Sequence, residues 1–235
     1  MSLITNGVQN PSVYVINTIN HVVNLDLLTE DSVIIDAGSN VGFFVEKMQQ
    51  LMKETKGFDL DLKIYAIEPG DYQCDVIKSK KFKNVELLQS ALVGTKTEKT
   101  LFYEYLHKSL KSTHKEMGEH PKYHQWGNVL GDHYDRFSSD KNIDVTIHEV
   151  ESLTLPELIQ SKNIKSIGYL KMDIEGVEYD VIEQMTQKEA DIINQISLEP
   201  HDPSKNAALV AKLTSLGYIV KETRMNEIYA YKKVI

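Results

Sequence analysis

The stretch VIIDAGSNVGFF, from Val33 to Phe44, decides which fold is expected of this chain. An apolar run that suits a buried strand ends at Asp36, and Gly38 and Gly42 follow it before an apolar segment with helical spacing. Glycine permits positive φ and lets a ligand approach the backbone closely, while the start of a helix offers free N–H groups and a partial positive charge. The stretch therefore predicts a strand–turn–helix unit with room for a ligand, and a tight turn without a ligand is the alternative.

The spacing of the two glycines restricts the kind of ligand. The sequence DAGSNVG has the form G-x-x-x-G, so the G-x-G-x-x-G pattern of a dinucleotide site is not met. Asp36 also places a carboxylate where a pyrophosphate would bring further negative charge. An acid at the end of this strand instead suits a ligand with a cationic amine, such as the amino-acid end of S-adenosylmethionine.

The remainder of the chain alternates between the periods of strands and helices. Strand-like runs fall at residues 32–36, 63–67, 85–89, 167–172 and 193–198, and helix-like segments fall at residues 43–57, 178–191 and 206–217. Strands that alternate with helices favour parallel pairing through crossover connections, and hence an open α/β sheet with helices on both faces. Two further strand-like runs, 218–223 and 227–232, predict a hairpin at the end of the sheet.

Composition sets the outer limits of the interpretation. The chain has 235 residues, of which 41% are hydrophobic, so we expect a single domain over residues 1–235, with residues 1–31 as an N-terminal helical extension. The net charge of −8 argues against general nucleic-acid binding, because phosphate neutralisation needs clustered positive charge. Cys74 is the only cysteine, which excludes an internal disulfide. We find neither a secretory signal nor eighteen apolar residues in succession, so we expect a cytoplasmic location without a membrane span.

Two more acids follow predicted strands directly. Glu68 ends the strand in IYAIEPG, 26 residues beyond Gly42, where an acid can accept hydrogen bonds from both hydroxyls of a ribose. Asp173 ends the strand in YLKMDIEGVEYDVI, where a carboxylate at the end of a buried parallel strand points into the ligand crevice. The alternatives are a solvated acid at residue 68 and a cluster of acids that complements the start of a helix. The second alternative explains Glu175 and Glu178 well and Asp173 poorly.

Together, the motifs DAGSNVGFF, IEPG, LLQSALVG and LKMDIEGVEYDVI resemble the FkbM family of S-adenosylmethionine-dependent methyltransferases. The resemblance covers residues 32–94 and resumes at 150. It implies a class I methyltransferase fold, a Rossmann-like sheet of seven mostly parallel strands with an antiparallel last strand and helices on both faces. It also implies transfer of a methyl group to an oxygen, commonly a hydroxyl of a sugar, a glycan or another small natural product.

The resemblance assigns roles to individual residues of this sequence. It implies that the methionine end of the cofactor contacts the loop residues Asp36, Gly38, Ser39, Asn40 and Gly42. It makes Glu68 the ribose ligand, places Ser90 and Ala91 at the edge of the adenine pocket, and counts Asp173 among the cofactor-binding residues.

Residues 97–149 depart from the family pattern, because they form a long segment rich in His and Tyr. The segment contains Trp126 and six of the eight histidines, His107, His114, His120, His124, His133 and His148. Their spacings repeat no known metal-ligand motif. We expect this insertion to be a lid or a substrate-binding segment over the crevice, and a contact between subunits of an oligomer is the alternative.

Methyl transfer from a sulfonium needs an aligned acceptor oxygen and a group that takes up its proton. The candidates for this catalytic role are Asp173, and Glu199 and His201 in LEPHD after the next strand. The same three residues are candidate ligands for Mg²⁺ or another divalent ion. The alternative for LEPHD is that it only ends the strand and starts a loop.

The sequence thus favours an S-adenosylmethionine-dependent O-methyltransferase with a small-molecule or carbohydrate acceptor. The alternative function is a non-catalytic or NAD-type nucleotide-binding module with a Rossmann-like fold. The missing third glycine argues against NAD, and the full set of crevice acids argues against a module without catalysis.

Overall fold

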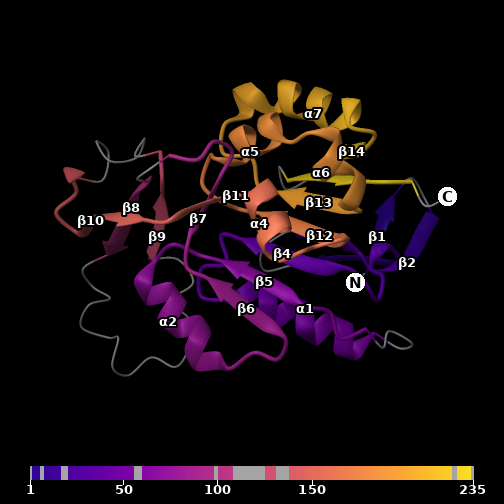
Figure 1. Ribbon diagram of the computed structural model, residues 1–235, viewed down its shortest axis with the longest axis horizontal. Helices are drawn as coiled ribbons and strands as arrows, with labels where there is room; N and C mark the ends of the chain where they lie inside the picture. The colour runs from indigo at the N-terminus through magenta and orange to yellow at the C-terminus, as the bar shows by residue number, and fades with distance from the viewer. Residues whose placement is uncertain are drawn as a thin grey trace.

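The computed structural model describes residues 2–5, 8–16, 21–55, 60–97, 100–107, 125–130, 138–223 and 227–233. Its centre is a seven-stranded sheet with the strand order β14-β15-β13-β12-β4-β5-β6 (Figure 1). These strands are β4 (Val33–Ala37), β5 (Ile64–Ile67), β6 (Val85–Leu88), β12 (Ile167–Met172), β13 (Gln195–Leu198), β14 (Ile219–Glu222) and β15 (Ile228–Tyr231).

Five neighbouring strands of this sheet, from β6 to β13, run parallel to one another. The C-terminal hairpin then completes the sheet, because β15 pairs antiparallel with both β13 and β14. The predicted class I methyltransferase fold, with seven mostly parallel strands and an antiparallel last strand, is therefore confirmed.

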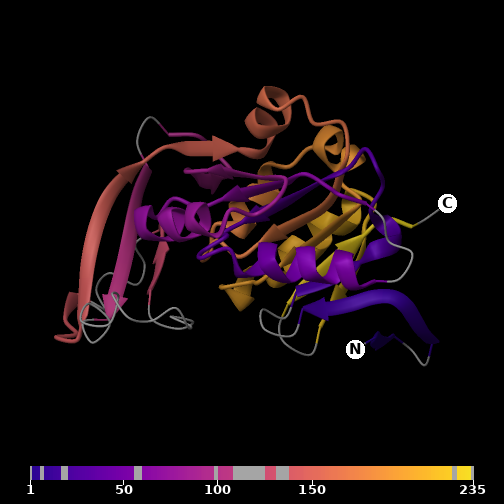
Figure 2. The same cartoon turned by 90° about the horizontal axis from the view of Figure 1, so that it is seen from below.

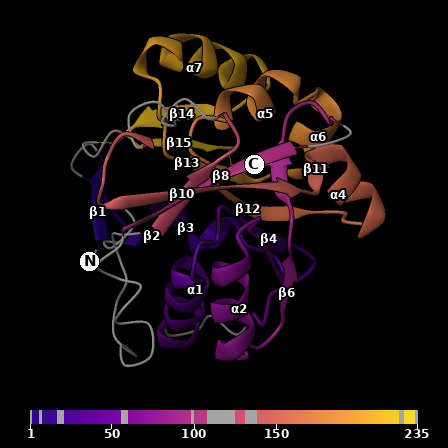
Figure 3. The ribbon, with the colours of Figure 1, turned by 90° about the vertical axis from the view of Figure 1, so that its left-hand side faces the viewer.

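Helices cover both faces of the sheet. Helices α1 (Phe43–Glu54) and α2 (Asp71–Lys80) lie on one side, and Figure 3 shows the remaining helices on the opposite side. These are α4 (Leu155–Ser161), α5 (Glu178–Gln184), α6 (Gln187–Ile192) and α7 (Asn206–Ser215). Among the described helices, none combines the length and the apolar character that a membrane crossing requires.

Alternation along each central strand produces two separate cores. In β4, Ile34 packs with α1, whereas Ile35 packs with the helices of the other face, because successive strand residues point in opposite directions. In β12, Tyr169 stacks on Phe44 of α1 while Leu170 joins the opposite core. Ile34 of β4 and Tyr169 of β12 therefore share the α1 side of the sheet.

The N-terminal segment was expected to be a helical extension, but its described residues are mainly strands, so that expectation was wrong. It forms β1 (Ser2–Thr5), β2 (Val8–Ile16) and β3 (His21–Asn24), an antiparallel sheet that Figure 2 shows beside the main sheet, followed by the short 3₁₀ helix η1 (Leu25–Leu27). The segment SVYVI is rich in β-branched and aromatic residues, which favour strands. Asn24 also exchanges two hydrogen bonds of 2.9 Å with the side chain of Gln195 on β13, which secures β3 against the main sheet.

Residues 178–191, expected as one helix-like segment, are divided in two. Helix α5 ends before Met185, whose backbone is extended and whose side chain is buried. Thr186 then starts α6 with a capping box, in which the Thr186 and Glu189 side chains bond to the first backbone N–H groups of the helix. Because α5 ends before Met185, the Met185 side chain reaches the core from an extended backbone.

The described part of residues 97–149 adds a second antiparallel sheet. Its strands are β8 (Thr100–His107), β9 (Gln125–Asn128) and β10 (Ile143–Val150), in the order β10-β8-β9, and Figure 2 shows the long β8 and β10 side by side at one end of the molecule. Two short strands, β7 (Ala91–Val93) and β11 (Ser152–Thr154), pair in parallel where this segment leaves and rejoins the main domain. His114, His120, His124 and His133 lie outside the described residues.

The capping box of α6 is open to a direct test. Thr186→Ala removes a side-chain acceptor from an exposed helix start, so we expect the free energy of unfolding to fall by about 1 kcal/mol. Urea denaturation measures this change. The control is Thr214→Ala, whose exposed hydroxyl donates to a carbonyl within α7 and caps no helix. A loss no larger than that of the control would mean that the capping box does not hold the start of α6.

Candidate functional site

A cleft lies at the carboxyl edge of the main sheet, where β4, β5 and β12 end. It contains about 600 Å³ of empty space, open solvent included. The lining residues come from these strand ends, from α2, from β7 and from the β8–β9 sheet: Gly38, Asn40, Ile67, Glu68, Pro69, Gln73, Ser90, Ala91, Leu92, Phe102, Gly127, Val129, Asp173, Ile174, Glu175 and Val177.

The loop after β4 has a backbone that other residues would strain. Gly38, Asn40 and Gly42 have φ angles of 73°, 47° and 75°, in the left-handed region. A Cβ atom on Gly38 would lie 1.7 Å from the carbonyl oxygen of Asp173, so only glycine lets this loop pack on the end of β12. The buried Ser39 donates a hydrogen bond of 2.7 Å to the carbonyl of Asp36, which closes the turn. Gly38 and Asn40 line the cleft, whereas Ser39 and Gly42 only shape the loop.

Beneath the loop lies a buried ion pair between Asp36 and Lys171. The Lys171 Nζ atom is 3.2 Å from an oxygen of Asp36, and both side chains are almost completely buried. The same Nζ atom donates hydrogen bonds to the carbonyls of Ala37 at 3.2 Å and Gly38 at 2.6 Å. Burial lowers the pKa of Lys171, but the nearby carboxylates of Asp36, Asp173 and Glu68 together raise it, with Asp36 contributing most, so the ammonium is retained. Asp36 therefore does not line the cleft. It fixes the ammonium of Lys171, and the ammonium fixes the loop through the carbonyls of Ala37 and Gly38.

Glu68 presents a carboxylate at the end of β5. One oxygen accepts from the backbone N–H of Asn40 at 2.8 Å, and the other accepts from that of Gly70 at 2.9 Å. Burial raises the pKa of Glu68 to about 7, against the opposing effect of these two hydrogen bonds. Beside it, the buried Gln73 side-chain oxygen lines the cleft without a partner among the described residues. Both groups are placed to accept hydrogen bonds from a ligand.

The opposite wall of the cleft is apolar. It is formed by Ala91 and Leu92 of β7, Phe102 of β8, and Val129. Phe102 is buried and packs against Gly127 so closely that a Cβ atom there would lie 2.1 Å from the ring. A wall of acceptors facing an apolar wall suits a ligand with a flat apolar ring joined to a polyhydroxyl part, which is the chemistry of a nucleoside.

Further along the edge, His201 is enclosed by acids. Its Nδ1 lies 3.1 Å from Glu178, and its Nε2 lies 3.4 Å from Glu175 and 3.8 Å from Asp173. Burial alone lowers the pKa of His201, but the hydrogen bond to Glu178 and the neighbouring carboxylates raise it to about 9. The ring is therefore a cation at neutral pH. Glu178 is buried and also accepts the backbone N–H groups of Ile174 and Gly176, so its role is to close the turn after β12.

The three candidate catalytic residues meet only in part. Among the described residues, Asp173 belongs to two groups whose ligand atoms lie within 4.8 Å of one another. One group joins it to Glu178 and His201, and the other joins it to Glu199 and the unforeseen His21. Glu199 and His201 therefore do not join Asp173 in one such group.

Of the residues expected to contact a cofactor, six line the cleft: Gly38, Asn40, Glu68, Ser90, Ala91 and Asp173. Lys171 and Gln73 were not predicted from the sequence as residues of the site. The signal for Lys171 was present, since a lysine in the middle of the apolar run IGYLKM is costly to bury without a partner. Gln73 had no such signal, because a polar residue in the first turn of a helix is ordinary.

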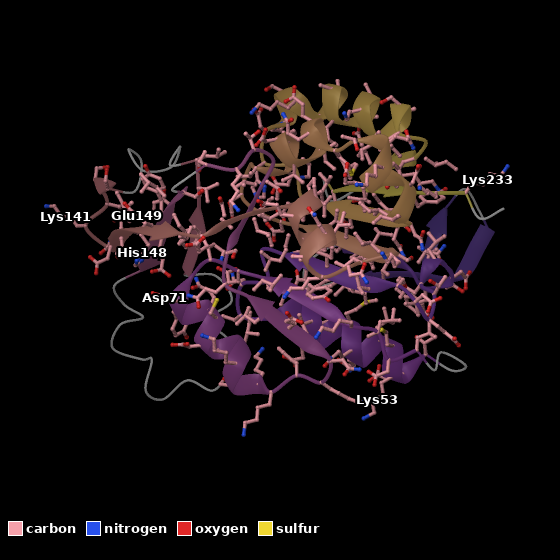
Figure 4. All side chains as sticks on the ribbon, in the orientation of Figure 1. Lys53, Asp71, Lys141, His148, Glu149 and Lys233 are labelled. Carbon is pink, nitrogen blue, oxygen red and sulfur yellow. The ribbon has the colours of Figure 1, made fainter. Side chains whose placement is uncertain are left out.

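A second groove lies between α2 and β10. Figure 4 shows Asp71, His148 and Glu149 near one another there, and Gln89 donates to Asp71 at 2.6 Å. His148 lies 3.3 Å from Glu104 on the neighbouring strand. This partly exposed histidine is thus paired with an acid and gives no support to a metal site in the insertion.

The chain is similar to known proteins in sequence and in fold. A family model described as the methyltransferase FkbM domain matches residues 36–220. The fold is similar to a precorrin-6y C5,15-methyltransferase from Geobacter metallireducens GS-15, with 14% identity, a TM-score of 0.43, and coverage of 88% of this chain and 82% of that one. It is also similar to a methyltransferase FkbM from Methylobacillus flagellatus KT, with 11% identity, a TM-score of 0.47, and coverage of 88% of this chain and 45% of that one. No curated protein matches the sequence.

The buried ion pair leads to a stability prediction. Lys171→Met leaves Asp36 buried without its cation, so we expect the free energy of unfolding to fall by about 3 to 5 kcal/mol. Urea denaturation measures the loss. Combining Lys171→Met with Asp36→Leu removes both charges and should recover much of it, because apolar residues of similar volume replace a buried pair well.

The control for this test is the partly exposed pair of Lys162 and Glu86, which are 2.7 Å apart. Lys162→Met should cost no more than about 1 kcal/mol, as exposed ion pairs contribute little. If Lys171→Met cost as little as Lys162→Met, the ion pair would not hold the loop and β12 together.

Proposed function

The chain belongs to the FkbM methyltransferase domain family, and from that premise we propose that it transfers a methyl group from S-adenosylmethionine to a hydroxyl oxygen of a small-molecule or carbohydrate acceptor. The observation that carries the proposal is the cleft at the carboxyl edge of the sheet. It sets the Glu68 carboxylate, fixed by two backbone N–H groups, opposite an apolar wall. S-adenosylmethionine offers matching chemistry, since its ribose hydroxyls donate and its adenine ring is flat and apolar on its faces.

In this proposal each wall of the cleft binds one part of the donor. Glu68 accepts from the ribose hydroxyls, and the unpartnered Gln73 oxygen accepts from a further donor of the ligand. Ser90 and Ala91 lie at the adenine edge. The methionine end lies against Gly38 and Asn40, the two loop residues that line the cleft, while Asp36 acts from beneath through Lys171. When bound, S-adenosylmethionine supplies a methyl group activated by a sulfonium.

The acceptor side of the cleft is formed by the turn after β12. Asp173 lines the cleft, is partly exposed, and has a backbone N–H that bonds to the carbonyl of Ala37 at 3.1 Å. This hydrogen bond fixes the backbone of Asp173 next to the methionine-end loop. We place the acceptor hydroxyl beside the Asp173 carboxylate. Asp173 and Glu199 are the proposed acceptors of the hydroxyl proton. His201 is a positioning residue, because its imidazolium is already shared among three acids.

A divalent ion held by Asp173, Glu199 and His201 is not favoured. Each ring nitrogen of His201 already faces a carboxylate, and Glu199 lies outside the group that His201 forms with Asp173. The β8–β9 part of residues 97–149 supports a ligand-binding role for the insertion, because Phe102, Gly127 and Val129 contribute to the lining of the cleft. The cytoplasmic location and oligomeric assembly stay predictions from the sequence.

Calorimetry tests the donor site without knowledge of the acceptor. We expect S-adenosylhomocysteine to bind the wild-type protein and NAD not to bind. Glu68→Ala should weaken S-adenosylhomocysteine binding by about 2 to 4 kcal/mol, because the two ribose hydroxyls lose their hydrogen bonds to a charged acceptor. Glu183→Ala, at an exposed position on α5, is the matched control and should leave the affinity unchanged. Binding of NAD in place of S-adenosylhomocysteine would refute the proposed function, and full affinity in Glu68→Ala would remove Glu68 from the site.

The pKa of Glu68 predicts how this affinity depends on pH. The ionised carboxylate accepts hydrogen bonds from hydroxyls more strongly than the neutral acid does, and burial raises its pKa to about 7 in the folded protein. Affinity should therefore fall as pH drops through 7, by about tenfold between pH 8 and pH 6. Lys171 and Asp36 face Glu68 with opposing charges and are retained in every variant of this test.

The control for the pH profile is Glu68→Gln, which keeps the shape of the side chain and removes its titration. Its affinity should be lower than that of the wild type at pH 8 and nearly constant from pH 6 to pH 8. If the wild type and Glu68→Gln showed the same slope, another group, such as Glu175, would be responsible for the pH dependence.

A further inference from the structure

His21 is a buried histidine on β3 that is held in one orientation. Its Nδ1 lies 2.8 Å from an oxygen of Glu227 and 3.0 Å from the hydroxyl of Ser197 on β13. The ring also meets Phe44 edge-on, with the two centroids 6.4 Å apart. The side chain is 0% exposed. Three separate segments therefore fix the position of this ring.

The hydrogen bonds decide which ring nitrogen of His21 carries the proton. The Oε1 atom of Glu227 accepts the backbone N–H of Val22 at 3.1 Å and also contacts the hydroxyl of Ser197. A backbone N–H can only donate, so this oxygen is an acceptor, and Nδ1 of His21 donates to it. Nε2 then carries a lone pair, yet it is buried without a partner among the described residues. A buried acceptor left in this state calls for a ligand.

Two carboxylates of the cleft edge are close to this ring. A ring nitrogen of His21 and one oxygen each of Asp173 and Glu199 all lie within 4.8 Å of one another. Two oxygen ligands of one divalent ion lie up to about 5 Å apart, since each metal–oxygen bond measures about 2.0 to 2.6 Å. Asp173 is partly exposed and Glu199 is exposed, so an ion can enter from the cleft and meet the buried imidazole last.

We propose that His21, Asp173 and Glu199 bind a divalent transition-metal ion of the Mn²⁺ type, with Glu227 as the residue that orients His21. Imidazole suits transition metals, and two carboxylates suit a hard ion such as Mn²⁺. A ligand histidine typically donates its other ring N–H to a carboxylate, and Glu227 fulfils this role. Three protein ligands leave coordination positions open toward the cleft, so the ion would orient the acceptor oxygen. This role rests on the proposed function, whereas the ion site itself does not.

The neighbouring group of Asp173, Glu178 and His201 does not meet the same conditions. Both oxygens of Glu178 accept backbone N–H groups, at 2.7 and 2.8 Å, and one of them also faces Nδ1 of His201. Neither nitrogen of His201 is left without a polar neighbour. These side chains satisfy one another, whereas His21 Nε2 has no partner among the described residues.

The site is tested by titrating Mn²⁺ into chelator-treated, full-length protein and following the electron paramagnetic resonance signal of free Mn²⁺. Loss of that signal measures binding, and electron–nuclear double resonance then detects a nitrogen ligand on the bound ion. We expect one bound Mn²⁺ with a histidine nitrogen coupling. His21→Gln should abolish this coupling and weaken binding at least tenfold, and Glu199→Gln should weaken binding to a similar extent. His201→Gln should keep the nitrogen coupling, and the surface variant His148→Gln should keep both the affinity and the coupling.

Each outcome of this experiment is decisive. Absence of Mn²⁺ binding by the wild type, or a nitrogen coupling that survives in His21→Gln and disappears in His201→Gln, overturns the proposal. If His21→Gln does not fold, two other results decide. Mn²⁺ binding must weaken in Glu199→Gln, and the nitrogen coupling must persist in His201→Gln. Calorimetry with S-adenosylhomocysteine on the chelator-treated protein keeps the two proposals apart, because none of the four substituted side chains lines the proposed donor site.

Discussion

The ammonium of Lys171 is the group on which the cleft depends. It is nearly fully buried, it lies 3.2 Å from Asp36, and it donates to the carbonyls of Ala37 and Gly38. Two charges removed from water are costly unless their remaining hydrogen-bonding capacity is used, and here one cation neutralises an acid and satisfies two carbonyls at once. The arrangement joins the carboxyl ends of β4 and β12. The loop after β4 can then leave the sheet with the N–H groups of Gly38 and Ser39 bonded to the carbonyl of Ile67 and that of Asn40 bonded to Glu68.

Much of the fold and part of the site followed from sequence, because both depend on local patterns. Parallel strands bring their carboxyl ends to one edge, so Glu68 and Asp173 could be placed there from their positions after apolar runs. The strands of the N-terminal segment and the role of His21 could not be foreseen. His21 meets Ser197 and Glu227, which are 176 and 206 residues away, and nothing local reports such a contact. The division of residues 178–191 was missed because helical periodicity continues across Met185, whereas the capping box at Thr186 was a readable signal.

The acids of the turn after β12 show how burial assigns different roles to chemically similar groups. Glu178 is buried and fully engaged with two backbone N–H groups and His201, so it is a structural residue. Asp173, five residues earlier, is partly exposed at the cleft, and Glu199 is exposed beside it. The motifs LKMDIEGVEYDVI and LEPHD contain these carboxylates with equal prominence. Only their distances from backbone donors and from the cleft distinguish a turn-closing acid from one that can meet a ligand.

The contact between Gly38 and the carbonyl of Asp173 has a consequence for how such a protein can diversify. Because a single added carbon at residue 38 would lie 1.7 Å from that oxygen, the loop after β4 and the turn after β12 form one rigid block, and neither can be reshaped without the other. Changes of ligand preference are then left to walls that are not part of this block. The β8–β9 sheet is such a wall, since Phe102 and Val129 reach the cleft from outside the main sheet and can vary while the block stays intact.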